Sequence, residues 1–144
     1  MIVVESSVIA ALFVSTPPAS ELAERALERD RDWSAPYSWR IEVCNMLALL
    51  VRHRRLALPD AELVMRKAQG LMAGNELDVP VDTVLSLAAS SGLAAYSCEG
   101  IALALAHRVP YVTTDDRVIS AFPQVAISLG NFVHSVPGLP PAEG

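Results

Sequence analysis

The sequence predicts an α/β sandwich in which a mostly parallel central sheet is flanked by helices. Short apolar and β-branched runs alternate with longer amphipathic stretches, apolar residues make up 52% of the chain, and charged residues make up 19%. Helices between short strands are typical of a parallel sheet, because parallel neighbours need a crossover connection. A chain of 144 residues is long enough to bury a core, so we expect one domain.

The N-terminal part is predicted to form a strand followed by two helices. Met1–Val4 is a β-branched run, and Ser7–Phe13 places apolar residues at helical spacing. After a pair of prolines, Ser20 is a candidate cap for a helix that ends near Asp30. The first strand would therefore end just before Glu5.

Two longer helices are predicted in the middle of the chain. Pro36 marks a break, and Trp39–Arg55 carries a helical apolar pattern with basic residues at its C-terminal end, as the helix dipole prefers. Pro59 suits the first turn of the next helix, which runs to about Met72 and is ended by Gly74.

The C-terminal half is predicted to alternate between strands and helices. In order, these are a strand at Leu77–Val79, helices at Thr83–Ala89 and Ser97–His107, a strand at Tyr111–Thr113, a helix at Arg117–Ala121 and a strand at Val125–Ser128. We expect the domain to span residues 1–133, and residues 134–144, which are rich in proline and glycine, to form a flexible tail.

The charge balance and the N-terminus limit the classes of function. A net charge of −5 argues against a generally cationic nucleic-acid-binding surface. Glu5 interrupts the apolar N-terminus, and the other apolar stretches are interrupted or short, so we expect neither a secretory signal nor a membrane span. A cytoplasmic protein with Cys44 and Cys98 as free core thiols follows.

Four polar positions interrupt apolar or small-residue surroundings. Glu5 and Asp115 each follow a predicted strand, Glu42 lies inside a helix and Ser97 lies at a helix start. Ligand sites in open α/β sheets gather at the carboxyl ends of the strands. There is no Gly-rich phosphate loop, no nucleophile elbow and no metal-ligand spacing among the histidines, so these positions are the credible chemical site.

The sequence around these positions resembles the four motifs of the PIN-domain nucleases of the VapC toxin type. The matching phrases are Ile2–Val8, Trp39–Leu47, Ala95–Ala104 and Val112–Asp115, in the family's order and within a resemblance that covers residues 1 to about 133. It implies a PIN-like three-layer sandwich and a Mg²⁺- or Mn²⁺-dependent endoribonuclease of a toxin-antitoxin system. It also implies an RNA substrate, a cognate antitoxin protein and a homodimer.

The family carries an Asp, a Glu, an Asp and a further acid at its four motif positions. Glu42 and Asp115 match this pattern, whereas Glu5 and Ser97 each replace an Asp. The resemblance therefore implies that Glu5, Glu42 and Asp115 are the catalytic and metal-binding residues. A hard cation such as Mg²⁺ is bound through a few carboxylates while it keeps waters and substrate phosphate in its shell.

Four further residues are candidates for supporting this site. Glu99 is a candidate metal ligand in place of the missing carboxylate, although two residues along a helix turn a side chain by ~200°. Asn45 shares a helical face with Glu42 and is a candidate to orient a carboxylate or a water; an ordinary amide, on the helix surface or buried, is an equal alternative. Ser97 and Thr113 offer hydroxyls, which a helix start and a strand end also favour.

Two altered motif positions leave two functions open. The longer side chain of Glu5 displaces its carboxylate by ~1 Å, a misplacement that can cost ~10²-fold in rate, and Ser97 removes a charge. One hypothesis is a ribonuclease with an altered site, to which Arg40 and Arg52 are weak candidates for RNA contacts. The other is a catalytically inactive PIN-fold module that binds RNA or a protein partner.

Overall fold

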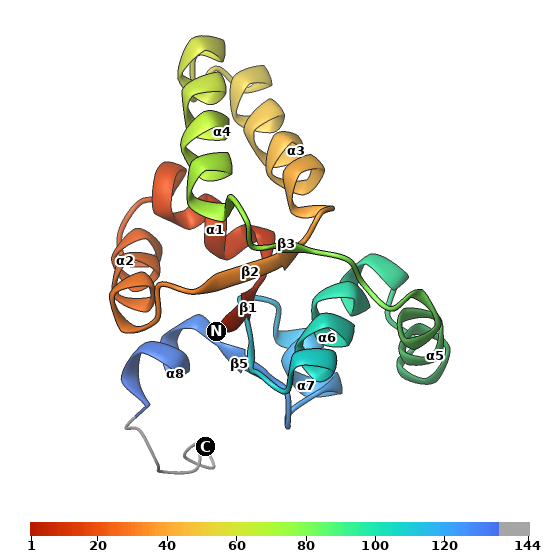
Figure 1. The fold of residues 1–144 in the computed structure, drawn as a ribbon. Coiled ribbons are helices and arrows are strands. Elements are labelled where there is room, and N and C mark those ends of the chain that lie inside the picture. Colours follow the sequence, from red (N-terminus) through yellow and green to blue (C-terminus); the bar gives the residue numbers. More distant parts are fainter. Residues whose placement is uncertain (136–144) are drawn as a thin grey trace.

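The structure is a computed structural model and describes residues 1–135. Its centre is a sheet of five parallel strands in the order β3-β2-β1-β4-β5. The strands are β1 (Ile2–Val4), β2 (Trp33–Pro36), β3 (Glu76–Leu77), β4 (Tyr111–Thr113) and β5 (Ala126–Ser128). Helices lie on both faces of this sheet (Figure 1), so the predicted three-layer α/β sandwich is confirmed.

The helices divide between the two faces of the sheet. They are α1 (Ser6–Val14), α2 (Ala19–Arg29), α3 (Trp39–Arg52), α4 (Leu58–Met72), α5 (Val81–Ser91), α6 (Ala95–His107), α7 (Asp116–Ala121) and α8 (Leu129–His134). Helix α6 packs on β1, β2 and β4 and also contacts α5, whereas α1 contacts α2, α3 and α4. Helices α3 and α4 extend together away from the sheet at the top of Figure 1.

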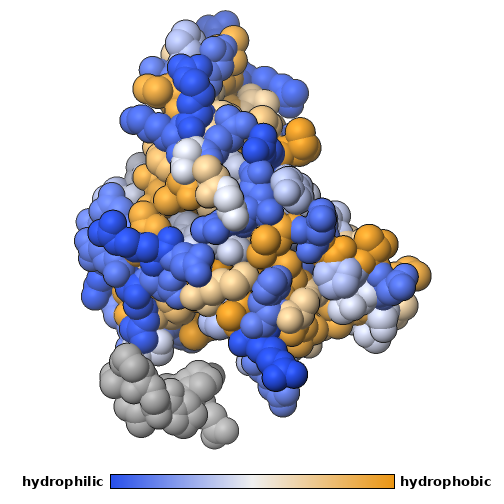
Figure 2. All heavy atoms as spheres, viewed as in Figure 1, coloured by the Kyte–Doolittle hydropathy of each residue, from blue (hydrophilic) through white to orange (hydrophobic). Residues whose placement is uncertain are grey.

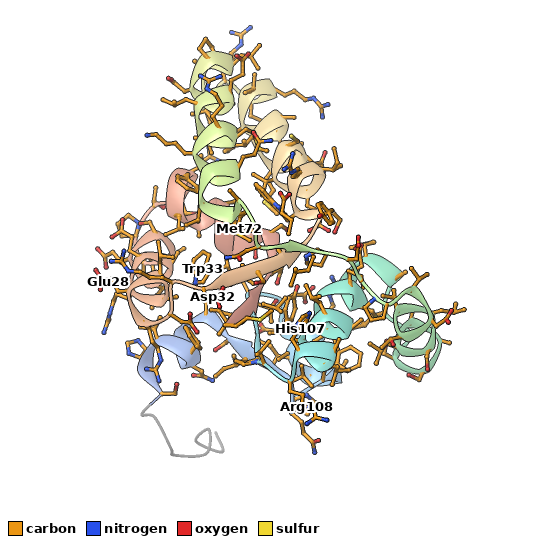
Figure 3. The ribbon with its side chains drawn as sticks, in the orientation of Figure 1. Glu28, Asp32, Trp33, Met72, His107 and Arg108 are labelled. Carbon is orange, nitrogen blue, oxygen red and sulfur yellow. The ribbon has the colours of Figure 1, made fainter. Side chains whose placement is uncertain are left out.

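Alternating side chains of the central strands fill a core on each face. Val4 of β1 joins the cluster that includes Trp33 and Met72, whereas Val3 packs with Ile101 and Leu103 of α6. This division follows from the period of two along a strand. Trp33 and Met72 are fully buried and are labelled in Figure 3, where Met72 ends α4 above the sheet.

Two elements were missing from the sequence prediction. Strand β2, which pairs with both β1 and β3, was treated only as a break at Pro36. Pro36 is its last residue and lies opposite Leu77 of β3. Helix α8 follows β5 at once and has six residues, too few to show a helical period; the Ser128 hydroxyl accepts from Asn131 N at 3.0 Å and caps it.

Several predicted boundaries and one thiol need correction. Helix α2 begins at Ala19, so Ser20 lies inside it and caps nothing. Helix α3 ends at Arg52, three residues early, because Arg54 has a φ of 55°. Cys44 is exposed on α3 and is not a core thiol, whereas Cys98 is buried, and both are free as predicted.

The end of the described chain bears on the predicted domain boundary. Helix α8 ends at His134, one residue beyond the predicted domain end. Residues 136–144 of the predicted tail lie outside the described residues. Within residues 1–135, no helix combines the length and the apolar character needed to cross a membrane.

Candidate functional site

The site is built where two central strands end next to each other. Strand β1 pairs in parallel with β4, with Val4 opposite Val112, so Glu5 and Asp115 leave the same edge of the sheet. Glu5 N donates to Val112 O at 2.9 Å, which holds the end of β1 against β4. Glu42 reaches the same edge from the first turn of α3.

A pocket of about 250 Å³ opens at this edge. It is lined by Glu5, Ser6, Glu42, Asn45, Met46, Tyr96, Ser97, Tyr111, Asp115, Arg117 and Val118. All four motif positions and Asn45 therefore border one space, although they come from distant parts of the sequence. We call this space the acidic pocket.

A smaller side pocket of about 20 Å³ adjoins the acidic pocket, and Glu5 and Glu42 line both. Glu99 lines the side pocket, where its Oε2 accepts a hydrogen bond of 3.1 Å from Ser38 Oγ. Ser97 lines only the acidic pocket. The rotation along α6 thus turns Ser97 and Glu99 to different compartments, but both compartments border the same two carboxylates.

Glu5 is held against the end of β4. Its Oε2 accepts hydrogen bonds from the Thr113 hydroxyl and from Thr114 N, the latter at 3.2 Å. Thr113 Oγ1 in turn accepts from Asp115 N at 2.9 Å. Thr113 is fully buried and therefore connects Glu5 to Asp115. The longer side chain of Glu5 reaches the Thr113 hydroxyl from the neighbouring strand.

Glu42 sits in an environment that disfavours its charge. Burial is the main reason that its pKa is raised, and the negative charges of Glu99 and Glu5 raise it further. A hydrogen bond of 2.5 Å from Ser6 Oγ acts in the opposite direction. Ser6 is itself buried, so it is a fixed donor at the start of α1.

Asp115 has the opposite electrostatic environment. Its Oδ1 and Oδ2 accept from Arg117 Nε at 3.3 Å and Nη2 at 3.1 Å, and Oδ1 also accepts from Arg117 N at 2.9 Å, which caps α7. These contacts with Arg117 lower the pKa of Asp115. The Arg117 side chain is 76% exposed, so this partner can leave without disturbing the core.

The sequence did not indicate that Tyr111, Tyr96 and Arg117 would line the acidic pocket. Tyr111 begins β4, is 6% exposed and packs against Gly100 of α6, whereas Tyr96 is 68% exposed at the same pocket. A tyrosine that opens an apolar strand and a glycine inside a helix were the signals available in the sequence. Neither signal indicates which partner the ring meets.

The two arginines proposed for RNA contacts lie outside the acidic pocket. Arg40 Nε and Nη2 donate to Glu76 at 2.6 and 2.8 Å, so its guanidinium is already engaged. Arg52 is the last residue of α3, ten residues and about 15 Å along the helix from Glu42. It lines an apolar groove between α3 and α4 instead.

The donor set fits a hard divalent cation in its chemistry. Glu5, Glu42 and Asp115 offer carboxylate oxygens, and the pKa of Glu42 is raised by burial and further by Glu99 and Glu5, an environment in which a bound cation would favour the ionised form. Within residues 1–135, however, no group of acidic, histidine or cysteine side chains is already arranged to hold a metal ion. The side chains would have to rotate, and Asp115 would have to release Arg117.

Comparison with known proteins supports the fold. The chain is similar to a crystal structure of PAE2754 from Pyrobaculum aerophilum, with a TM-score of 0.74, 20% sequence identity and 92% of each chain covered. A likeness at this identity shows the architecture alone. Comparison of the sequence with protein-family models and with curated proteins gives no match.

Proposed function

We propose that this protein is a metal-dependent endoribonuclease resembling the VapC toxins. The observation that carries the proposal is the convergence of Glu5, Glu42 and Asp115 in one pocket at the carboxyl edge of β1 and β4. Carboxylates that lie close together repel one another and destabilise the fold when no cation neutralises them. Such clusters are therefore found mainly at functional sites. The resemblance of the motif phrases supplies the reaction class, hydrolysis of an RNA phosphodiester.

The proposed cofactor is Mg²⁺ or Mn²⁺. Glu5, Glu42 and Asp115 would hold it, with Glu99 as a further candidate ligand beside Glu5 and Glu42. When bound, such an ion lowers the pKa of a water and stabilises negative charge on the phosphate.

The remaining polar residues orient the carboxylates. Thr113 and Ser6 donate hydrogen bonds to Glu5 and Glu42, which hold one oxygen of each carboxylate and leave the other for a ligand. Asn45 and Ser97 line the same wall and offer an amide and a hydroxyl for positioning a water.

Arg117 has a second use once Asp115 takes part in cation binding. Its exposed guanidinium borders the acidic pocket, and releasing Asp115 frees it to pair with a phosphate oxygen. This makes Arg117 a stronger candidate for RNA contact than Arg40, whose guanidinium is held by Glu76, or Arg52, which lies along the other groove. We expect RNA binding to be local to the acidic pocket, in keeping with the net charge of −5.

Protein partners belong to the same proposal. Large apolar side chains are unusually exposed on α3 and α5: Ile41 is 74% exposed, Val81 75% and Leu85 69%. Figure 2 shows apolar surface over α5 at the right of the molecule. Such surface supports association with an antitoxin or with a second copy of the chain, as the resemblance implies for a cytoplasmic toxin.

A second candidate function is a PIN-fold module without catalysis that binds RNA or a protein partner. Two observations favour it. Ser97 contributes no charge to the acidic pocket, and Arg117 occupies the carboxylate of Asp115. Either feature weakens the affinity of the site for a cation.

RNA cleavage in Mn²⁺ separates the two functions. We expect the wild type to cut single-stranded RNA and Asp115→Ala to lower the rate by about 10²-fold or more, because a carboxylate of the metal site is lost. Asp116→Ala is the matched control, since Asp116 is the adjacent acid, is exposed and does not line the acidic pocket. Glu5→Asp/Ser97→Asp is expected to cut faster than the wild type.

The outcomes point in different directions. Equal activity of wild type and Asp115→Ala would show that any cleavage comes from a contaminant and would end the nuclease proposal. An inert wild type with an active Glu5→Asp/Ser97→Asp variant would assign the binding-module function to the natural protein.

A further inference from the structure

The acidic pocket contains a buried hydroxyl that none of the contacts above uses. Tyr111 is 6% exposed and lines both the acidic pocket and the side pocket. Its hydroxyl forms no hydrogen bond with another described residue. Within residues 1–135, Trp33 Nε1 is the one side-chain polar atom that is fully enclosed and has no partner, so the Tyr111 hydroxyl is not fully enclosed. The Tyr111 hydroxyl therefore borders the open space of the pockets.

The backbone of α6 fixes the position of this ring. A Cβ added at Gly100 would lie 2.2 Å from Cε2 and 2.6 Å from Cζ of Tyr111, far inside van der Waals contact. Only glycine at position 100 leaves the ring this space, and Cζ carries the hydroxyl. The phenol is thus held by main-chain packing and has little freedom to turn away from the pockets.

Burial and the surrounding negative charges keep the Tyr111 phenol protonated, so it remains a hydrogen-bond donor. Burial raises the pKa of Tyr111 well above its usual range, and the carboxylates of Glu5, Glu42, Asp115 and Glu99 all raise it further. A neutral phenol can donate its proton to an anion, whereas ionised carboxylates can only accept.

Two other donors of the acidic pocket already bind carboxylates in the structure. Ser6 Oγ donates to Glu42, and the Arg117 guanidinium donates to Asp115. An anion that enters a pocket lined by carboxylates needs donors as well as a cation, because the carboxylates repel it. Asn45 and Arg117 are exposed and Ser97 is half-buried, whereas the Tyr111 hydroxyl belongs to a buried, fixed ring and can meet the anion without rearrangement.

We propose that the Tyr111 hydroxyl donates a hydrogen bond to a non-bridging oxygen of a phosphate bound in the acidic pocket. The proposal rests on the proposed ribonuclease function, and it adds a catalytic and binding residue outside the four motif positions. Gly100 acts through Tyr111 as a positioning residue. The contact would strengthen as negative charge gathers on the phosphate during cleavage.

The first test removes the hydroxyl and keeps the ring. In Mn²⁺, Tyr111→Phe is expected to lower kcat/KM for a single-stranded RNA by about 10²-fold, the usual cost of losing one donor to a developing oxyanion. Tyr37→Phe is the matched control, because Tyr37 is exposed and lines neither pocket. An unchanged Tyr111→Phe beside an active wild type would overturn the inference and leave the ribonuclease function intact.

A modified substrate distinguishes a hydrogen bond from a structural effect. Sulfur in place of one non-bridging oxygen is a poor acceptor, so the wild type should cut one phosphorothioate isomer more slowly than the natural RNA. Tyr111→Phe should show no further slowing with that isomer, because the bond is already absent. Independent, multiplicative losses from the mutation and from the sulfur would mean that the hydroxyl does not touch that phosphate.

Phosphate binding tests the inference even if the wild type cuts no RNA. Calorimetry with inorganic phosphate in the presence of Mg²⁺ should give an affinity about tenfold weaker for Tyr111→Phe than for wild type or Tyr37→Phe. In that case the phosphate contact stands while the nuclease function fails. Equal affinities, or no binding by the wild type, would overturn the contact.

Discussion

Two glutamates of this protein sit near the same end of α3 and have opposite environments. Glu76, on the edge strand β3, accepts from Arg40 Nε at 2.6 Å, Arg40 Nη2 at 2.8 Å and Trp39 Nε1 at 2.7 Å. Glu42, on α3, has one neutral donor, Ser6, and two carboxylates nearby, Glu5 and Glu99. The pKa of Glu76 is lowered by its partners, whereas the pKa of Glu42 is raised by burial and by like charge.

This difference separates a carboxylate that stabilises the fold from one that does not. Glu76 satisfies the buried indole N–H of Trp39 and joins β3 to the start of α3. Glu42 gains little from its surroundings and borders a pocket instead. A half-buried acid without a matching cation is a better mark of a functional site than cavity size, since the larger groove between α3 and α4, about 500 Å³, is mostly apolar.

Glu76→Ala should give the largest loss of stability in this comparison. The substitution leaves the indole N–H of Trp39, a residue that is 1% exposed, without an acceptor, at a cost of about 1–3 kcal/mol in the free energy of unfolding. Urea denaturation measures this change. Glu76→Gln keeps an acceptor oxygen and should cost less; a loss as large as that of Glu76→Ala would assign the effect to the charge of Glu76 and not to Trp39.

The sequence predicted most of the helices because their apolar residues recur at helical spacing over several turns, as in α3 and α4. It predicted β1 and β4 from short β-branched runs. It did not predict β2, where Trp33, Ser34 and Ala35 are buried with no polar alternation, or α8, which is only six residues long. Both depend on neighbours supplied by distant parts of the chain.

The candidate site shows the same limit. That Glu5 and Asp115 would meet followed from two strand ends, and Glu42 was added by the resemblance. The contacts of Tyr111 with Gly100, and of Ser38 with Glu99, arise from the packing of α6 on the sheet, which no local pattern encodes. The roles of these residues in metal binding and cleavage stay predictions.

Glu42→Gln should move stability in the opposite direction to Glu76→Ala. Without divalent ions, removing the disfavoured charge while keeping an acceptor for Ser6 should stabilise the fold by about 0.5–2 kcal/mol. Mn²⁺ should then raise the melting temperature of the wild type more than that of the variant, because binding to the native state stabilises it. Glu24→Gln, at an exposed acid of α2, is the control and should change neither value. A destabilised Glu42→Gln in chelator would contradict the comparison.

The smallest expected effect is the pH dependence that Glu76 adds. Its folded pKa lies below the ordinary value of 4.5, chiefly because of the Arg40 hydrogen bonds, so the unfolded chain binds more protons at acid pH. The stabilisation from the ionised Glu76 is therefore complete above pH 4.5 and is lost as the pH falls through the lowered folded pKa. The contribution of Glu42 to the pH dependence of stability has the opposite sign, because its raised pKa makes its ionised form destabilising as the pH rises.

Urea unfolding of wild type and Glu76→Gln between about pH 7 and pH 3 isolates the contribution of Glu76. We expect the difference in unfolding free energy between them to shrink only at the acid end; a difference constant with pH would show that Arg40 and Glu76 do not interact through charge.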